Sequence, residues 1–133
     1  MKSARKTIAQ YFECLTAGEA EQLLKSISKQ NFLKIGTDEG EIVTGAQKAA
    51  EYYRHHVAST DKFSIETRRL DVHERDTISW FFTEQVWTLE WKGTPETLAM
   101  RITGVLENQD ALWKFVQIHA SIGSPNLIEG EYP

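Results

Sequence analysis

The side chains of this sequence that could move protons are carboxylates and histidines set among aromatic residues. Glu84 ends the run Ile-Ser-Trp-Phe-Phe-Thr-Glu, where a carboxylate between apolar neighbours must be paired, protonated or exposed. His56 and Asp38 are the other candidate catalytic residues, because imidazole titrates near neutrality and Asp38 stands in the run Thr-Asp-Glu-Gly. Tyr11 or Tyr53 could supply a proton from its hydroxyl. Together they indicate general acid–base chemistry on a small substrate.

Each candidate also has a purely structural interpretation. Thr-Asp-Glu-Gly is a generic turn sequence, in which Asp38 would be an exposed turn residue. Glu84 would be solvated at the rim of a cleft. Aromatic residues at helical or strand spacing are more often packing residues than ligand contacts. The residues alone leave both interpretations open.

The remaining histidines indicate neither a metal site nor a catalytic triad. His119 shares a strand face with Gln117 and Ser121, because alternate residues of a strand point the same way. No acidic residue is available to orient His119, so we assign these three residues to a polar dimer interface. His55 and His56 are adjacent on a predicted helix and point about 100° apart, which excludes joint metal binding. Since a Gly-rich phosphate loop is also missing, we predict no cofactor.

The composition is that of an ordinary globular protein. The 133 residues carry a formal net charge of -4 and include a single cysteine, Cys14, which cannot form an internal disulfide. The charge provides no basic surface for nucleic acid, and no apolar run approaches the roughly 20 residues of a membrane span. We therefore expect a cytoplasmic protein with neither nucleic acid nor membrane as a partner. One domain over 1–123 and a C-terminal tail over 124–133 are predicted.

Helical spacing of apolar residues dominates the N-terminal half. Ser3 can cap a first helix that stops at Gly18, and Thr44 with Gln47 forms a capping box for a third helix. The predicted helices cover 3–18, 20–27 and 44–59, and a small hairpin of strands 32–35 and 42–43 lies between the last two.

From Lys62 onward the apolar period falls to about two residues, which predicts a sheet. Four long strands are expected over 63–73, 77–91, 97–107 and 112–122, and their short connections force antiparallel neighbours. The fold class is therefore α+β, with three helices packed on a curved antiparallel sheet.

Both faces of this sheet carry large side chains. The apolar set that includes Met100, Ile102 and Ile118 is expected to pack on the helices, together with Trp80 and Phe82. The opposite face mixes aromatic and polar residues over an area that monomers seldom expose, so we expect a second copy of the chain to cover it as a homodimer. The predicted interface residues are Phe81, Trp87, Arg101, Thr103, Trp113, Gln117, His119 and Ser121.

Three stretches of the sequence carry a resemblance to a known family. They are 35–41 followed by Gly45, 78–84, and 101–123, which ends in Trp-Lys-Phe-Val-Gln-Ile-His-Ala-Ser-Ile-Gly. The sequence resembles the SnoaL-like branch of the nuclear transport factor 2-like superfamily, which also includes the association domain of calcium/calmodulin-dependent kinase. The resemblance implies a cone-shaped fold with a pocket in its mouth. The residues expected around that pocket are Tyr11, Tyr53, His56, Trp80, Phe82, Glu84, Ile102 and Ile118.

The sequence departs from the pattern of the catalytic members. Isomerases of the superfamily use an aspartate near the first hairpin, for which Asp38 is the comparable residue, and a second acid that is missing here. In the kinase association domain arginines line the pocket, but the matching positions are Phe82, Gly104 and Ala120.

Two functions from different classes remain. The first is a module that binds a small apolar molecule or oligomerises without chemistry of its own. The alternative is an isomerase, cyclase or dehydratase that acts by proton transfer, with Glu84 or His56 as base. The observation that separates these functions is whether Glu84 or His56 shares a water-accessible cavity with a tyrosine hydroxyl.

Overall fold

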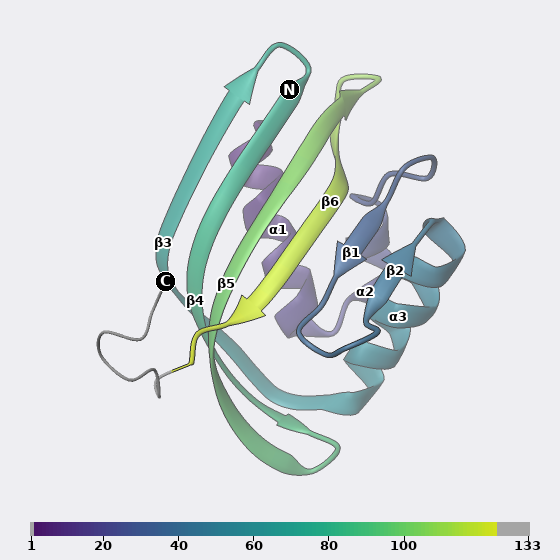
Figure 1. Cartoon of the computed structure of the whole chain (residues 1–133). Helices are drawn as coiled ribbons and strands as arrows, with labels where there is room; N and C mark the ends of the chain where they lie inside the picture. The colour runs from purple at the N-terminus through teal and green to yellow at the C-terminus, as the bar shows by residue number, and fades with distance from the viewer. Residues whose placement is uncertain (1, 125–133) are drawn as a thin grey trace.

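The computed structural model describes residues 2–124 as three helices and one six-stranded sheet (Figure 1). The helices are α1 (Ala4–Ala17), α2 (Ala20–Leu24) and α3 (Ala46–Ser59). The strands are β1 (Leu33–Ile35), β2 (Ile42–Thr44), β3 (Thr60–Arg75), β4 (Ile78–Trp91), β5 (Thr94–Gln109) and β6 (Leu112–Ile122). The α+β class and the four long antiparallel strands are confirmed. The predicted tail lies outside the described residues except for Ser124.

Helix α1 begins and ends at the predicted residues. Its N-cap is Ser3, whose hydroxyl accepts a hydrogen bond from the Lys6 backbone N–H at 3.2 Å. Gly18 ends it in the left-handed conformation, with φ 75°, which glycine adopts without steric cost. The side chains of Ile8 and Leu15 are buried on the sheet side.

The predicted N-cap of α3 is wrong by one residue. Thr44 ends strand β2, paired with Leu33, and so does not cap the helix. Gly45 takes the N-cap position with φ 85° and no side-chain hydrogen bond, while its N–H donates to the Phe32 carbonyl at 3.0 Å. The Thr44 backbone is held in the strand ladder, so the capping box with Gln47 does not form.

The sheet order is β2-β1-β6-β5-β4-β3. Neighbouring long strands are antiparallel, whereas β1 joins β6 in parallel, with Leu33 opposite Gln117. This parallel pairing docks the small hairpin on the C-terminal strand. In Figure 1 the sheet curls at its lower end towards α3, and α1 lies behind it. The arrangement leaves an opening between α3, the hairpin and the curled strands.

The predicted faces of β4 are reversed. Phe81 is 3% exposed and packs 6.0 Å from the Phe115 ring, whereas Trp80 is 39% exposed. Phe81 stands opposite Gly104, and residues directly opposite in an antiparallel ladder share a face. Because both sets of β4 residues include aromatic side chains, alternation alone could not decide between them. Trp80, Phe82 and Glu84 therefore point away from the helices.

The predicted faces of β6 are wrong for its first residues, because the strand contains a β-bulge. Val105 pairs with Gln117 but Leu106 pairs with Phe115, which leaves Val116 as the extra residue. Beyond the bulge Trp113 and Phe115 turn inward and are buried in the core. Strict alternation had placed them on the outer face.

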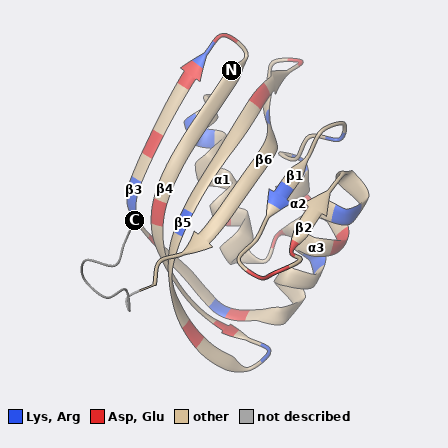
Figure 2. Cartoon of the chain, viewed as in Figure 1, with Lys and Arg blue, Asp and Glu red and all other residues tan. Residues whose placement is uncertain are grey.

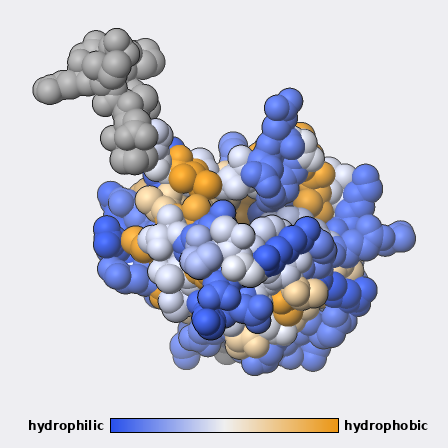
Figure 3. Space-filling view, turned by 90° about the horizontal axis from the view of Figure 1, so that it is seen from below, coloured by the Kyte–Doolittle hydropathy of each residue, from blue (hydrophilic) through white to orange (hydrophobic). Residues whose placement is uncertain are grey.

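Charges of both signs are scattered along the strands and helices, and acidic residues gather on the connection between β1 and β2 (Figure 2). Seen from below, hydrophobic atoms form separate patches among hydrophilic ones (Figure 3). None of the helices within residues 2–124 has the length and apolar character needed to cross a membrane.

Gly104→Ala should destabilise the protein by about 1–3 kcal/mol, as overpacked cores do. A Cβ at this position would lie 2.5 Å from the Phe81 ring and 2.8 Å from the Gln117 carbonyl oxygen. Gly123→Ala is the matched control, because its Cβ would meet no atom within 3.8 Å. Urea unfolding should show a change below about 0.5 kcal/mol for the control. Equal effects of the two substitutions would contradict the inward position of Phe81.

Candidate functional site

A cavity of about 440 Å³ lies between α3, the hairpin of β1 and β2, and the curled strands β4 to β6. Part of the lining is apolar and contains two tryptophan side chains. It includes Trp87, Leu89, Trp91, Leu98 and Met100. The polar part of the lining includes Lys34, Asp38, Glu41, Tyr52 and His56. The cavity is thus suited to a molecule with an apolar body and at least one polar group.

Lys34, Glu41 and Tyr52 form a connected polar group in this lining. Lys34 Nζ lies 3.4 Å from Glu41 Oε2, and the Tyr52 hydroxyl donates to the same oxygen at 3.1 Å. Lys34 Nζ also lies 4.7 Å from the centre of the Tyr52 ring, a cation–π contact. Burial lowers the pKa of Lys34, which Glu41 partly opposes. Burial, reinforced by the negative charge of Glu41, raises the pKa of Tyr52.

Gly36 makes room for the Glu41 carboxylate. A Cβ on Gly36 would lie 1.4 Å from Glu41 Oε2, so any larger residue would displace the acid from Lys34 and Tyr52. The Gly36 N–H donates to the Glu41 carbonyl at 2.9 Å, which holds the two ends of the turn together. The glycine is required here by close approach and not by an unusual φ.

His56 is the unpaired polar residue of the cavity wall. It is 7% exposed, and its Nδ1 is buried without a hydrogen-bond partner among the described residues. Its ring centre lies 5.6 Å from that of Trp91 and 6.1 Å from that of Tyr52. Burial first, then the charge of Lys34, lowers the pKa of His56 to about 4. The imidazole is therefore neutral at pH 7 and can accept a proton.

The predicted tyrosine donors lie in the core. The Tyr11 and Tyr53 hydroxyls are hydrogen bonded to each other at 2.5 Å, and both residues are buried. Burial raises the pKa of each. Neither residue lines this cavity, and Tyr52, one position before Tyr53, presents its hydroxyl there instead. Ile102 and Ile118 are likewise buried core residues.

Three further predicted pocket residues lie on the outer face of the sheet. Glu84 is 3.9 Å from Arg69 in an exposed ion pair, and Arg69 also lies over the Phe82 ring. Trp80 stacks on His73 with ring centres 5.4 Å apart. Of the candidate catalytic residues, the structure brings Asp38 and His56 to the cavity and leaves Glu84 outside it.

The predicted interface residues divide between the two faces. Arg101, Thr103, Gln117 and His119 are exposed on the outer face, where Arg101 Nε donates to the Ser121 hydroxyl at 3.2 Å. A groove of about 460 Å³ runs over this face beside Phe82. Phe81 and Trp113 lie in the core and Trp87 lines the cavity, for the reasons of strand register given above.

Sequence reasoning missed Lys34 and Glu41. Lys34 is on a strand of three residues, too short for a reliable pattern, and Glu41 follows a turn that is typical of solvent exposure. A signal was present nevertheless, because both Gly36 and Glu41 lie in the stretch 35–41 that carries the family resemblance.

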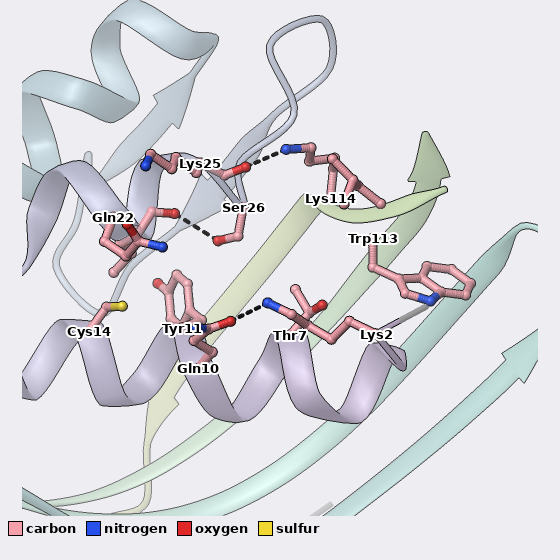
Figure 4. Close-up of a pocket in the computed structure, with 12 residues that line it drawn as sticks. Lys2, Thr7, Gln10, Tyr11, Cys14, Gln22, Lys25, Ser26, Trp113 and Lys114 are labelled. Carbon is pink, nitrogen blue, oxygen red and sulfur yellow. Dashed lines mark hydrogen bonds between the residues drawn. The ribbon is translucent and has the colours of Figure 1, made fainter. Parts of the chain in front are cut away.

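A second, smaller pocket of about 160 Å³ lies between α1, α2 and β6 (Figure 4). Three lysines line it, but two of them already have partners. Lys2 donates to the Gln10 side chain and Lys114 to the Lys25 carbonyl. This pocket is lined by no carboxylate or histidine, so it offers less acid–base chemistry than the cavity beside α3.

Comparison with solved structures defines the class of fold. A proposed dehydratase of the nuclear transport factor 2-like family from Streptomyces avermitilis superposes with a TM-score of 0.80 at 13% identity, over 89% of this chain and 91% of that chain. A ketosteroid isomerase-like protein from Erwinia carotovora atroseptica gives 0.76 at 14% identity, over 91% and 94%. A proposed calcium/calmodulin-dependent protein kinase II association domain from Xanthomonas campestris gives 0.77 at 18% identity, over 95% and 91%.

These likenesses show a nuclear transport factor 2-like cone fold. The sequence profile of the SnoaL-like domain matches residues 4–125, nearly the whole chain. The protein therefore belongs to the SnoaL-like domain family, and the resemblance in the sequence is confirmed. A sequence search among curated proteins finds no match.

Lowering the pH from 7.5 to 5 should destabilise the protein through His56. The folded pKa is about 4, against 6.5 for an ordinary histidine. Between these values the unfolded chain binds the proton more readily, so the stability is complete above the ordinary pKa and falls as the pH drops towards the folded pKa. Urea unfolding should show a loss of about 2 kcal/mol at pH 5.

Two variants separate this effect from other titrations. His56→Gln should remove most of the pH dependence, whereas His73→Gln, at an exposed position, should retain it. An NMR titration that gives His56 an ordinary histidine pKa would contradict the assignment.

Proposed function

We propose that the cavity binds a small molecule with an apolar or aromatic body and one hydrogen-bonding group directed at His56. The observation that carries the proposal is the buried His56 Nδ1 without a partner. An unsatisfied buried polar atom costs about 1–3 kcal/mol, and a hydrogen-bonding group of a ligand would remove that cost.

The form of the cavity supports the same proposal. Its volume of about 440 Å³ falls within the range of roughly 300–1,000 Å³ for small-molecule sites. Trp87 and Trp91 provide flat apolar walls against which a ring or chain can pack. Lys34, Glu41 and Tyr52 add donors and an acceptor, and these would orient the polar end of the ligand.

Proton transfer is the second candidate function, favoured by the cavity that His56 shares with the Tyr52 hydroxyl. With a pKa of about 4 the imidazole is a weak base that is free to accept a proton at pH 7. Glu41 is a second acceptor, and Tyr52 takes the donor role that we had predicted for Tyr11 or Tyr53. Relatives of the same fold described as a dehydratase and as ketosteroid isomerase-like make this class of reaction reasonable.

The outer face of the sheet supports self-association. It combines exposed Trp80, half-buried Phe82 and the polar residues Arg101 and His119 around a groove. A mixed aromatic and polar surface of this kind fits a second copy of the chain, and one relative of the same fold is described as an association domain.

Binding of benzyl alcohol should change the tryptophan fluorescence of the wild-type protein, because Trp87 and Trp91 line the cavity. Leu98→Trp should fill the cavity and weaken binding by at least about tenfold, equal to 1.4 kcal/mol. Trp80→Phe, on the outer face, removes an unrelated tryptophan and should leave the affinity unchanged. A response that is lost with Trp80→Phe and retained with Leu98→Trp would contradict the cavity as the binding site.

Light scattering should return the mass of a dimer at micromolar concentration. Phe82→Asp places a charge in the proposed interface and should yield a monomer that remains folded by circular dichroism. Glu74→Asp, at an exposed position on β3, serves as control. A wild-type monomer, or a dimer unaffected by Phe82→Asp, would exclude this interface.

A further inference from the structure

Lys34 is an unusual residue for the interior of this protein. It lies on β1 between β2 and β6, its side chain is 9% exposed, and it lines the cavity. Lysine is almost never fully buried unless it is paired. The pair with Glu41 contributes little net stability, because removing two charges from water offsets most of their attraction. Stability alone therefore does not explain a lysine at this position.

The Lys34 amine has capacity left for a ligand. Among residues 2–124 the hydrogen bond found for Nζ is the 3.4 Å contact to Glu41, although an ammonium group has three donors. The Tyr52 ring covers one side of the nitrogen at 4.7 Å. Lys34 also lines the cavity, together with Trp87 and Trp91.

Burial also favours the neutral amine. The pKa of Lys34 is lowered mainly by desolvation, while Glu41 acts in the opposite direction. A buried lysine whose pKa falls becomes a nucleophile at neutral pH, which is how lysines form Schiff bases with carbonyl compounds.

We propose that Lys34 Nζ forms a Schiff base with an aldehyde or ketone whose apolar body occupies the cavity. The proposal deepens the binding function above and rests on it, because the same cavity must first hold the ligand. It names a class of ligand, carbonyl compounds with an aromatic or aliphatic body, and a covalent attachment site that the family assignment does not supply.

The reaction conserves atoms and charge. After the ammonium loses a proton to solvent, the Nζ lone pair attacks the carbonyl carbon and the C=O π electrons move to oxygen. The attached nitrogen, now positively charged, gives up a second proton as the oxygen gains one, which gives a neutral carbinolamine. The oxygen then takes up the proton that the ammonium released to solvent and leaves as water. The carbon–nitrogen double bond forms as the carbon–oxygen bond breaks. An ammonium and a carbonyl thus yield a protonated imine and water, with one positive charge before and after.

Because the nitrogen of Lys34 is positively charged before and after the reaction, Glu41 can position it in both states. Its carboxylate faces Lys34 Nζ in the free protein and would face the protonated imine in the adduct, so the ion pair persists. Tyr52 holds the carboxylate by its hydroxyl, and Gly36 leaves the space in which the carboxylate lies. The apolar part of the lining would hold the ligand body.

The test treats the full chain with benzaldehyde at pH 7.5, adds sodium cyanoborohydride to reduce the imine, and maps the benzylated lysines by mass spectrometry. One equivalent is expected on Lys34. Its labelling should exceed that of exposed Lys62 several-fold, because the cavity would hold the aldehyde beside Lys34 Nζ and burial favours the neutral amine. The comparison is made within the wild-type protein, so it does not depend on a variant folding.

Two variants serve as matched controls. Lys34→Arg keeps the positive charge beside Glu41 but cannot form an imine, so the single adduct should disappear. Lys62→Arg should leave it unchanged. Labelling spread evenly over the exposed lysines, or an unmodified Lys34, would overturn the proposal.

Benzyl alcohol distinguishes the two levels of inference, because it fits the same space and cannot form an imine. If the alcohol binds but benzaldehyde gives no adduct on Lys34, the Schiff base is excluded and the binding cavity stands. If neither occurs, both proposals fail. If the alcohol binds and Lys34 is selectively labelled, both are supported.

Discussion

The packing of the Phe81 ring over Gly104 decides which side of the sheet faces the helices. Only a residue without a side chain leaves room for the ring, and the contact fixes the register of β4 against β5. Because strand residues alternate, this one pairing sends Thr83 and Gln85 inward and Trp80 and Phe82 outward. The cavity wall formed by Trp87 and the outer aromatic surface both follow from it.

Local signals in the sequence predicted the helices and strands well, but they predicted less well which face of each strand is buried. Ser3 and Gly18 bound α1 because caps depend on residues close in sequence. The faces of β4 and β6 depend on partners far along the chain and on a bulge at Val116, which no alternation pattern contains. For the same reason His56 was found and Lys34 was not. His56 attracts interest through its chemistry alone, whereas Lys34 matters only because a remote strand encloses it.

The candidate site joins two opposite electrostatic situations within one cavity. Lys34 is paired with Glu41, which opposes the effect of burial on the lysine pKa, and Tyr52 hydrogen bonds to the same carboxylate. His56 has no counterion among residues 2–124, and burial together with the nearby lysine keeps it neutral. A polar wall with one fixed ion pair and one uncharged base is compatible with simple binding and with proton transfer. The apolar part of the lining is common to both functions.

The parallel contact between β1 and β6 has a consequence for the order of folding. Residues 33–44 provide Lys34, Gly36 and Glu41. Their strand β1 pairs with β6, which spans Leu112–Ile122. During synthesis the N-terminal helices can form early, while the hairpin must wait for almost the whole chain to emerge. Joining such distant segments closes a long loop and slows folding. The polar half of the cavity is therefore assembled last, so a nascent chain carries no complete site.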